Sequence, residues 1–304
     1  QNGNTTDRDF DFRAWDQTTG TAGTKVDTST NGGTTAFSTA TETATITTTD
    51  VNDAPVLDNS GSLALTTQAE DGGAPVGAVG TVITDLVQTG GNVTDVDASS
   101  QTGVAITAAD TANGSWWYTT DSGTNWNALG SVSESSARVL NASSTTRVYF
   151  QSDADYNGSI SDAITFRAWD RSVGTNGSLQ DASTTGGTSA FSTDSETADL
   201  TITAVNDAPT LTNGITVHLA GTNEDTPSTG SLVSSIFASA GGNDVDAGSL
   251  SSIAVTSTVG NGTWQYSTDG TNSTDFGTVV ADSALLLTST TRVRYSPDTI
   301  DGET

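Results

Sequence analysis

Short runs with strand-like patterns recur along the whole chain. Residues 104–107, 115–120, 147–150, 163–169 and 198–203 either alternate apolar with polar positions or are rich in β-branched and aromatic residues. Both patterns are typical of strands that bury one or both faces. We therefore predict an all-β chain built from many short strands.

Turn signals and one helical pattern separate these runs. Asp-Ser-Gly-Thr at 121–124 and Asp-Gly-Thr-Asn at 269–272 are typical of hairpin turns. Residues 230–240 instead place apolar side chains at helical spacing, which predicts about one turn of helix. Residues 170–191 are polar and rich in Gly and Thr, and we expect a long loop or an extra hairpin there.

The same motifs return in the same order about 150 residues later in the chain. Asp-Val-Asn-Asp-Ala-Pro at 50–55 returns as Ala-Val-Asn-Asp-Ala-Pro at 204–209, and Phe-Arg-Ala-Trp-Asp at 12–16 returns at 166–170. Further matched segments are 32–39 with 186–193, 70–71 with 224–225, 95–98 with 244–247, 113–118 with 261–266, and 145–150 with 290–295. The chain is therefore predicted to be a tandem repeat.

These matches divide the chain into three parts. Residues 1–55 form the C-terminal part of one repeat, 56–209 form a complete repeat, and 210–304 form the N-terminal part of a further repeat that complements 1–55. Many short strands in units of about 150 residues predict β-sandwiches. The chain is either a segment of a longer array, which we favour, or a subunit whose residues 1–55 complete a neighbour's residues 210–304.

The chain is strongly acidic, with 9 Lys+Arg against 36 Asp+Glu and a formal net charge of −27. Nucleic acids and anionic membranes need a basic surface, so we expect neither as a partner. The acidity fits either a solubilising surface or carboxylates that bind divalent cations. The chain has no Cys and no run of about 18 apolar residues, so we expect no disulfides, no thiolate metal sites and no membrane insertion.

Four features resemble the motifs of cadherin repeats. They are the linker at 50–55, the acidic Glu70 that follows it, the Asp-Val-Asp at 95–97, and the Ala-Trp-Asp at 14–16 and 168–170. With Asn-Gly-Thr-Trp-Gln-Tyr-Ser-Thr-Asp-Gly at 261–270, nearly the whole chain is similar to the cadherin-like repeats of very large bacterial surface proteins. Two departures are Ala204 in place of an aspartate in the second linker, and no counterpart of the family's Asp-Arg-Glu motif.

This resemblance implies tandem Greek-key β-sandwich repeats of the cadherin or immunoglobulin type, joined end to end with calcium at each boundary. It also implies an extracellular location at the bacterial cell surface, in a fibre or in the stalk of an adhesin. Calcium takes about six to eight oxygen ligands, which a boundary between repeats can gather from several segments.

The expected ligands fall into two sets. For the first boundary they are Asp50, Asn52, Asp53, Glu70 and Asp16, with Asp95, Asp97 and Asp170 on the far side. For the second boundary they are Asn206, Asp207, Glu224, Asp170, Asp244 and Asp246. The alternative is that Asn-Asp-Ala-Pro is only a turn capped by its own side chains. Residues 153–158 fit either a polar turn or a local calcium loop.

We interpret the chain as a structural, calcium-stiffened repeat segment. It would act as a rod-like spacer and assemble end to end with identical repeats or subunits in a fibre. The alternative is a carbohydrate-binding module in which an exposed Trp, such as Trp117 or Trp126, stacks on a cell-surface or matrix glycan. An enzyme is not expected, because His218 is the only histidine and no nucleophile-elbow motif accompanies it.

Overall fold

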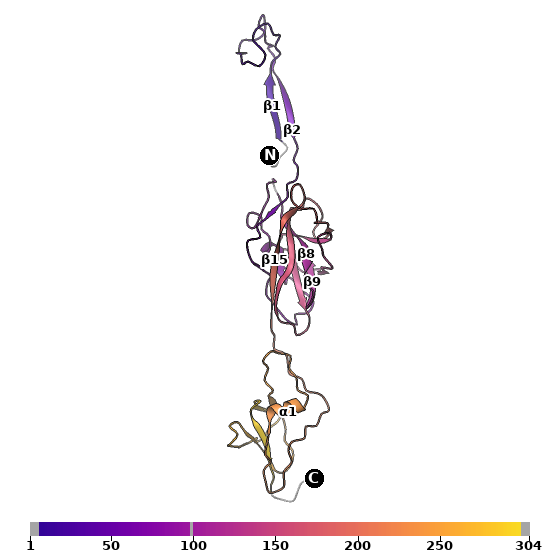
Figure 1. Ribbon diagram of the computed structural model, residues 1–304, viewed down its shortest axis with the longest axis vertical. Helices are drawn as coiled ribbons and strands as arrows, with labels where there is room; N and C mark the ends of the chain where they lie inside the picture. The colour runs from indigo at the N-terminus through magenta and orange to yellow at the C-terminus, as the bar shows by residue number, and fades with distance from the viewer. Residues whose placement is uncertain (1–5, 98–99, 299–304) are drawn as a thin grey trace. The chain divides into compact units, whose positions relative to one another are not determined.

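The computed structural model describes residues 6–97 and 100–298, and the chain divides into two compact units, Gln1–Thr203 and Ala204–Thr304 (Figure 1). Nearly all of the regular elements are strands. The described residues contain one α-helix, α1 (Val233–Ser239), and one 3₁₀ helix, η1 (Ile83–Asp85). The predicted all-β class is confirmed, and α1 lies in the stretch where helical spacing was expected.

The first unit begins with a hairpin of β1 (Thr6–Phe12) and β2 (Glu42–Thr48). The two strands pair antiparallel, from Thr6 opposite Thr48 to Phe12 opposite Glu42. Within the described part of the chain they pair only with each other. The side chains of Phe10 and Ile46 are each 66% exposed, so one apolar face of this hairpin is open to water.

The rest of the first unit, residues 50–203, contains two large sheets. The larger sheet follows the order β14 (Leu179–Gln180), β11 (Ala137–Asn141), β8 (Gly103–Ala109), β13 (Gly158–Trp169), β15 (Phe191–Thr203) and β4 (Leu63–Ala64), and β5 (Gln68–Ala69) also pairs with β15. The smaller sheet follows the order β10 (Asn127–Ala128), β9 (Gly114–Thr119), β12 (Arg147–Ser152) and β6 (Thr81–Val82). A short pair, β3 (Val56–Leu57) with β7 (Val93–Thr94), lies outside both sheets.

Side chains from both large sheets meet in one core. Ile106, Phe166 and Leu200 of the larger sheet belong to the same buried cluster as Trp116 and Phe150 of the smaller sheet. Two sheets that share a core in this way form a sandwich-like domain. We call residues 50–203 the complete domain.

Alternation along β9 gives its two adjacent Trp residues different environments. Trp116 is buried in the core and packs against Phe150, with ring centroids 5.0 Å apart. Trp117 faces the other way, is half-buried, and donates from Nε1 to Gln151 Oε1 at 3.1 Å. The prediction that one ring is core and the other partly exposed is confirmed.

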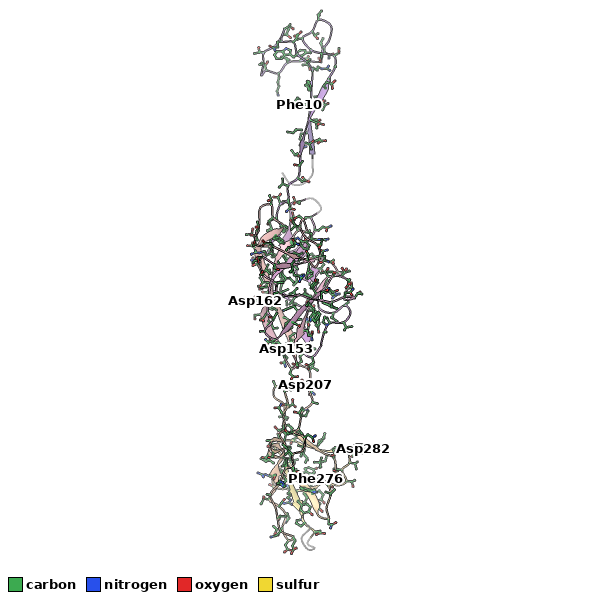
Figure 2. The ribbon with its side chains drawn as sticks, turned by 90° about the vertical axis from the view of Figure 1, so that its right-hand side faces the viewer. Phe10, Asp153, Asp162, Asp207, Phe276 and Asp282 are labelled. Carbon is green, nitrogen blue, oxygen red and sulfur yellow. The ribbon has the colours of Figure 1, made fainter. Side chains whose placement is uncertain are left out.

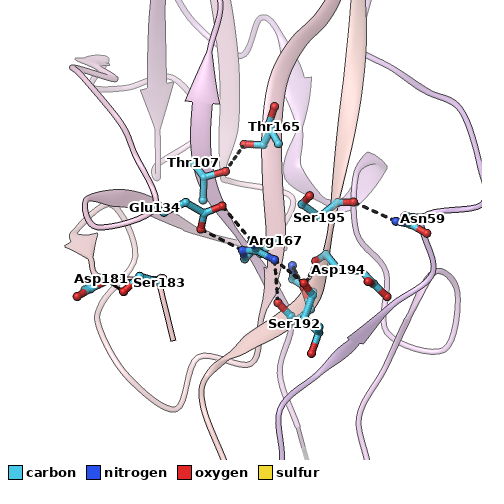
Figure 3. Close-up of polar contacts among 12 residues, drawn as sticks. Asn59, Thr107, Glu134, Thr165, Arg167, Asp181, Ser183, Ser192, Asp194 and Ser195 are labelled. Atoms are coloured by element: carbon cyan, nitrogen blue, oxygen red, sulfur yellow. Dashed lines mark hydrogen bonds and ion pairs between the residues drawn. The ribbon is translucent and has the colours of Figure 1, made fainter. Parts of the chain in front are cut away.

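Arg167 ties three segments of the complete domain together on its surface. Its guanidinium makes a two-point ion pair with Glu134, with 3.0 Å between Nη2 and Oε1 and 3.1 Å between Nε and Oε2 (Figure 3). Nη1 also donates to Thr193 O at 2.6 Å, at the start of β15. The side chain therefore fastens β13 to the loop before β11 and to β15.

The second unit has the same kinds of element in smaller sheets. One sheet follows the order β16 (Ser231–Leu232), β21 (Arg292–Ser296), β18 (Thr263–Ser267) and β19 (Thr274–Asp275). A separate pair joins β17 (Ile253–Val255) and β20 (Leu285–Leu287). Its buried cluster is small and consists of Val233, Leu287 and Val293. Residues 215–219, which have a strand-like sequence, form no strand here.

Candidate metal centre

The linker 50–55 packs onto one end of the complete domain through its polar groups. Asn52 donates from Nδ2 to Asp170 Oδ2 at 2.8 Å and to Ser189 O at 3.2 Å. The backbone N–H of Asp53 donates to Asp97 Oδ2 at 2.8 Å, and that of Ala54 donates to Gly187 O at 2.8 Å. The linker is therefore held by carboxylates that come from two distant parts of the sequence.

Strand ends place these carboxylates together. Asp170 directly follows β13 and is 8% exposed, and Asp95 directly follows β7. The N–H of Asp97 donates to Asp95 Oδ1 at 2.9 Å, which fixes the Asp-Val-Asp turn, and both residues line one pocket with Asp50 and Asn52 of the linker. We name Asp50, Asn52, Asp53, Asp95, Asp97 and Asp170 the linker cluster.

The electrostatics of the linker cluster favour a bound cation. Burial raises the pKa of Asp95, the Asp97 N–H lowers it in part, and the negative charges of Asp97, Asp170 and Asp53 raise it further. The second oxygen of Asp95, Oδ2, is buried and has no hydrogen-bond partner within the described residues. A carboxylate oxygen in this state gains from a cation that replaces its lost water.

A pocket of about 350 Å³ opens over the linker cluster. Its lining includes Asp50, Asn52, Asp95, Asp97 and Asp170, and also Arg171, whose positive charge offsets part of the acidity. The side-chain atoms that could ligate a metal in this pocket are almost all oxygens, which suits a hard cation such as Ca²⁺ rather than Zn²⁺. The cluster offers more carboxylate and amide oxygens than the about six to eight that calcium needs.

A second acidic group lies at the other end of the complete domain. Glu70 is 2% exposed, accepts from Asn157 Nδ2 at 2.9 Å, and donates its N–H to Thr203 O at 3.0 Å. Asp155 donates its N–H to Asp71 Oδ1 at 3.2 Å, and the carboxylate oxygens of these two residues come within 4.8 Å of each other. Residues 153–158 thus form a polar turn that joins the Glu70 end of the domain.

This placement corrects the expected grouping of Glu70 with Asp50, Asn52 and Asp53. Glu70 bonds to the last residue of β15, whereas Asp170 donates its N–H to Ala190 O, just before β15 begins. A strand of 13 residues spans about 40 Å, so the two ends are far apart. The reason is topological: residues 63–69 run parallel to β15 and carry Glu70 away from the linker.

The same geometry corrects the expected placement of Asp170 in the second set. Asp170 lies at the linker end of the complete domain, and the chain leaves that domain at Thr203, at the opposite end. The residues that sequence reasoning left out of the expected ligand sets are Asp71, Asp155 and Asn157. The repeated Glu-Asp at 70–71 and 224–225 marked the first of these, and the alternate oxygens of 153–158 marked the others.

Asp16 is also separated from the linker that follows it. Asp16 lies beyond the Phe12–Glu42 end of the hairpin, and Asp50 lies beyond the Thr6–Thr48 end. Paired strands of 7 residues hold these ends about 20 Å apart, so the expected grouping of Asp16 with Asp50 is wrong. Bonds from the hydroxyl and N–H of Thr18 to Asp16 Oδ1 lower the pKa of Asp16.

The second unit repeats the geometry of the linker cluster. The N–H of Asp207 donates to Asp246 Oδ2 at 2.9 Å, and the N–H of Asp246 donates to Asp244 Oδ1 at 3.0 Å. Asn206 donates to Asp207 O at 3.0 Å, as Asn52 does to Asp53 O at 3.2 Å. Carboxylate oxygens of Asp207 and Asp246 come within 4.8 Å of each other. Glu224 lies in an exposed turn of the same unit.

Other candidate residues occupy ordinary positions. His218 is exposed and lies in a segment without regular secondary structure. Trp126 is half-buried, donates from Nε1 to Gly77 O at 3.1 Å, and packs edge-on against Tyr149.

Comparisons with protein-family models, with curated proteins and with solved structures gave no match to this chain. Among the described residues, no helix is long and apolar enough to cross a membrane.

Proposed function

We propose that the chain is a calcium-stiffened repeat segment of an extracellular bacterial fibre or adhesin, in which it acts as a rod-like spacer. The observation that carries this proposal is the linker cluster, in which four carboxylates and an amide line one pocket and the N–H of Asp53 bonds to one of these carboxylates. The same backbone-to-carboxylate bonds recur between Asp207, Asp246 and Asp244. A feature that returns in each repeat suits a structural role better than a single active site does.

The residues have defined roles in this proposal. Asp95, Asp97 and Asp170 supply carboxylate oxygens from the body of the domain, and the linker supplies the amide oxygen of Asn52 and the carboxylate of Asp53. Bound calcium supplies two positive charges that offset the repulsion among these carboxylates. Linker and domain then behave as one body, and without the cation the linker is held only by its hydrogen bonds. Tandem Greek-key sandwiches and cadherin-like repeats belong to the same proposal.

Thermal unfolding with and without calcium tests this function. Extracellular calcium modules have dissociation constants of about 10⁻⁴–10⁻³ M. A cation present at about 10 mM then stabilises the folded state by about 1.4–2.7 kcal/mol per site. For a domain of this size, such a gain raises the unfolding midpoint by about 3–11 °C over the value in EDTA.

A matched pair of variants makes the experiment specific. Asp97→Asn keeps an oxygen that accepts from the Asp53 N–H but removes one charge, so the calcium shift falls to less than half. Asp85→Asn removes one negative charge from an exposed position in η1, outside the linker cluster, and keeps the full shift. Equal midpoints in calcium and EDTA for the unmodified chain, or equal calcium shifts in the two variants, contradict the proposal.

A further inference from the structure

The pocket over the linker cluster contains one positive side chain among its carboxylates. Arg171 lines this pocket together with four aspartates of the linker cluster. Cations are scarce in this chain, which has 9 Lys+Arg against 36 Asp+Glu, and residues 50–203 contain four arginines and no lysine. One of the few positive charges of the complete domain therefore lies in the site that we propose for calcium.

Arg171 differs from the other three arginines of the complete domain in its contacts. Arg138 and Arg147 donate to backbone oxygens at 2.8 and 3.1 Å, and Arg167 forms the ion pair with Glu134. Among the described residues, the side chain of Arg171 makes no hydrogen bond and no ion pair. Its guanidinium is thus not one of the ties that fasten segments of the domain together, and its charge is what it contributes to the pocket.

The backbone at Arg171 gives no structural reason for a long cationic side chain. Its φ is +68°, in the left-handed region that favours glycine and asparagine. Gln17 has the same φ of +68° at the matching position of the repeated motif on the hairpin. In both copies the preceding aspartate accepts the N–H of the following residue, at 2.9 Å from Thr18 and 2.7 Å from Ser172. The turn therefore forms equally well around a neutral side chain.

The size of the pocket keeps this charge close to the carboxylates. A sphere of 350 Å³ is about 9 Å across, which is close to the Debye length of about 8 Å at physiological salt. Arg171 always carries its positive charge, because a guanidinium is not deprotonated in proteins. It therefore offsets part of the repulsion among the aspartates when no other cation is present.

The same charge opposes a divalent cation in the pocket. Calcium brings two positive charges to the linker cluster, and like charges at this separation repel each other. The carboxylates still attract calcium, since Asp95 Oδ2 is buried and has no hydrogen-bond partner in the described part of the chain. Arg171 and calcium are thus competitors for one set of carboxylates.

We propose that Arg171 is a built-in counter-ion of the linker cluster that competes with calcium. Without calcium, its guanidinium reduces the repulsion among the aspartates and keeps the linker on the domain. When calcium binds, the guanidinium is displaced towards solvent. Arg171 thereby raises the calcium concentration at which the linker stiffens. This inference rests on the proposed calcium function and names the residue that regulates it.

The effect of Arg171 is confined to one end of the complete domain. Figure 2 shows Asp153 near the opposite end, where the acidic turn 153–158 lies. The 13 residues of β15 hold the two ends about 40 Å apart. That distance is several Debye lengths at physiological salt. Arg171 therefore acts on the linker cluster and leaves the Glu70 end of the domain unaffected.

Calcium titration of residues 1–304 by isothermal calorimetry tests the inference, with Arg171→Gln as the main variant. Glutamine is the residue that the same turn carries at position 17, so the variant keeps the fold. At about 10 mM salt, loss of the charge tightens calcium binding at one site by about tenfold, or about 1.4 kcal/mol. At about 1 M salt the gain falls below about twofold, because the Debye length shrinks from about 30 to about 3 Å.

Two further variants separate the local charge from side-chain shape and from net charge. Arg171→Lys keeps the positive charge, so calcium affinity stays within about twofold of the unmodified chain. Lys25→Gln removes one positive charge from an exposed position in the loop of the hairpin and leaves the affinity unchanged. Equal tightening in Lys25→Gln and Arg171→Gln shows an effect of net charge alone and overturns the proposal.

Thermal unfolding in EDTA supplies a readout that needs no bound calcium. Arg171→Gln lowers the unfolding midpoint of the complete domain by about 2–5 °C, because the carboxylates lose their counter-ion. In about 10 mM calcium, well above the dissociation constants of extracellular modules, the same variant unfolds at or above the midpoint of the unmodified chain. A residue that served only packing lowers both midpoints by the same amount, and that result overturns the proposal.

The titrations distinguish failure of this inference from failure of the calcium function. If neither the unmodified chain nor Arg171→Gln binds calcium, the calcium function is wrong and this inference falls with it. If both bind calcium with the same affinity at low salt, only the role of Arg171 is wrong.

Discussion

Phe166 and Phe12 occupy the same place in the repeated Phe-Arg-Ala-Trp-Asp motif but lie in opposite environments. Phe166 is fully buried in the core of the complete domain, and Phe12 is 46% exposed on a hairpin whose strands pair only with each other in the described residues. Truncation of a buried Phe to Ala costs about 3–5 kcal/mol, because it loses transfer free energy and leaves a cavity. Phe166→Ala therefore lowers the unfolding midpoint of the complete domain by about 6–20 °C.

Phe12→Ala has a much smaller effect on the same transition. At about half burial its side chain contributes about 1–1.5 kcal/mol of transfer free energy, and that contribution belongs to the hairpin. Differential scanning calorimetry at about 1 μM, where association is weak on the scale of typical affinities, compares the two variants. A cost below about 1 kcal/mol for Phe166→Ala, or equal shifts for both variants, refutes the assignment of one buried and one open copy of the motif.

Three further variants test local features of the complete domain. Asp95→Asn raises the unfolding midpoint in EDTA and reduces the calcium shift, because burial and neighbouring carboxylates raise the pKa of Asp95. In EDTA the unmodified domain therefore gains stability as pH falls through the raised folded-state pKa of Asp95. A variant whose stability has the same pH profile as the unmodified domain would contradict this. Gly123→Ala has an unfolding midpoint several degrees below that of Gly90→Ala. Both glycines have positive φ, but only at Gly123 would a Cβ overlap Gly77 O. Equal midpoints would argue against this close approach. Glu134→Gln lowers the free energy of unfolding, measured by chemical denaturation, by less than about 1 kcal/mol, because the ion pair with Arg167 is at the surface and Arg167 keeps its bond to Thr193 O. A loss above about 2 kcal/mol would mean that solvent screens the ion pair far less than its exposure indicates.

The sequence was sufficient for the class of fold and for several local elements. Period-two alternation located β8, β9 and β12, and helical spacing located α1, because each of these patterns is set by residues close together in the chain. The opposite environments of Trp116 and Trp117 followed from the same alternation. The pairing of Asp53 with Asp97 and of Asn52 with Asp170 joined residues that the expected ligand set had already placed in one group.

The direction of chain segments was not readable from local patterns. Nothing near Glu70 indicates that residues 63–69 run parallel to β15, and this direction decides which end of the domain Glu70 reaches. The irregular conformation of residues 215–219 is likewise not readable from their own sequence. Its alternation is strand-like, but a strand needs a neighbour to satisfy its backbone groups, and this information lies outside the segment itself.

The parallel pairing of residues 63–69 with β15 has a mechanical consequence. If tension is applied at residues 52 and 203, the two segments are pulled along their own axes in opposite directions. The bonds from Leu65 N to Asp199 O, at 2.8 Å, and from Glu70 N to Thr203 O, at 3.0 Å, are then loaded in shear together rather than peeled one at a time. Such a joint resists extension until several bonds break at once, and the rate of that single event, rather than the equilibrium stability, sets the force that the domain withstands.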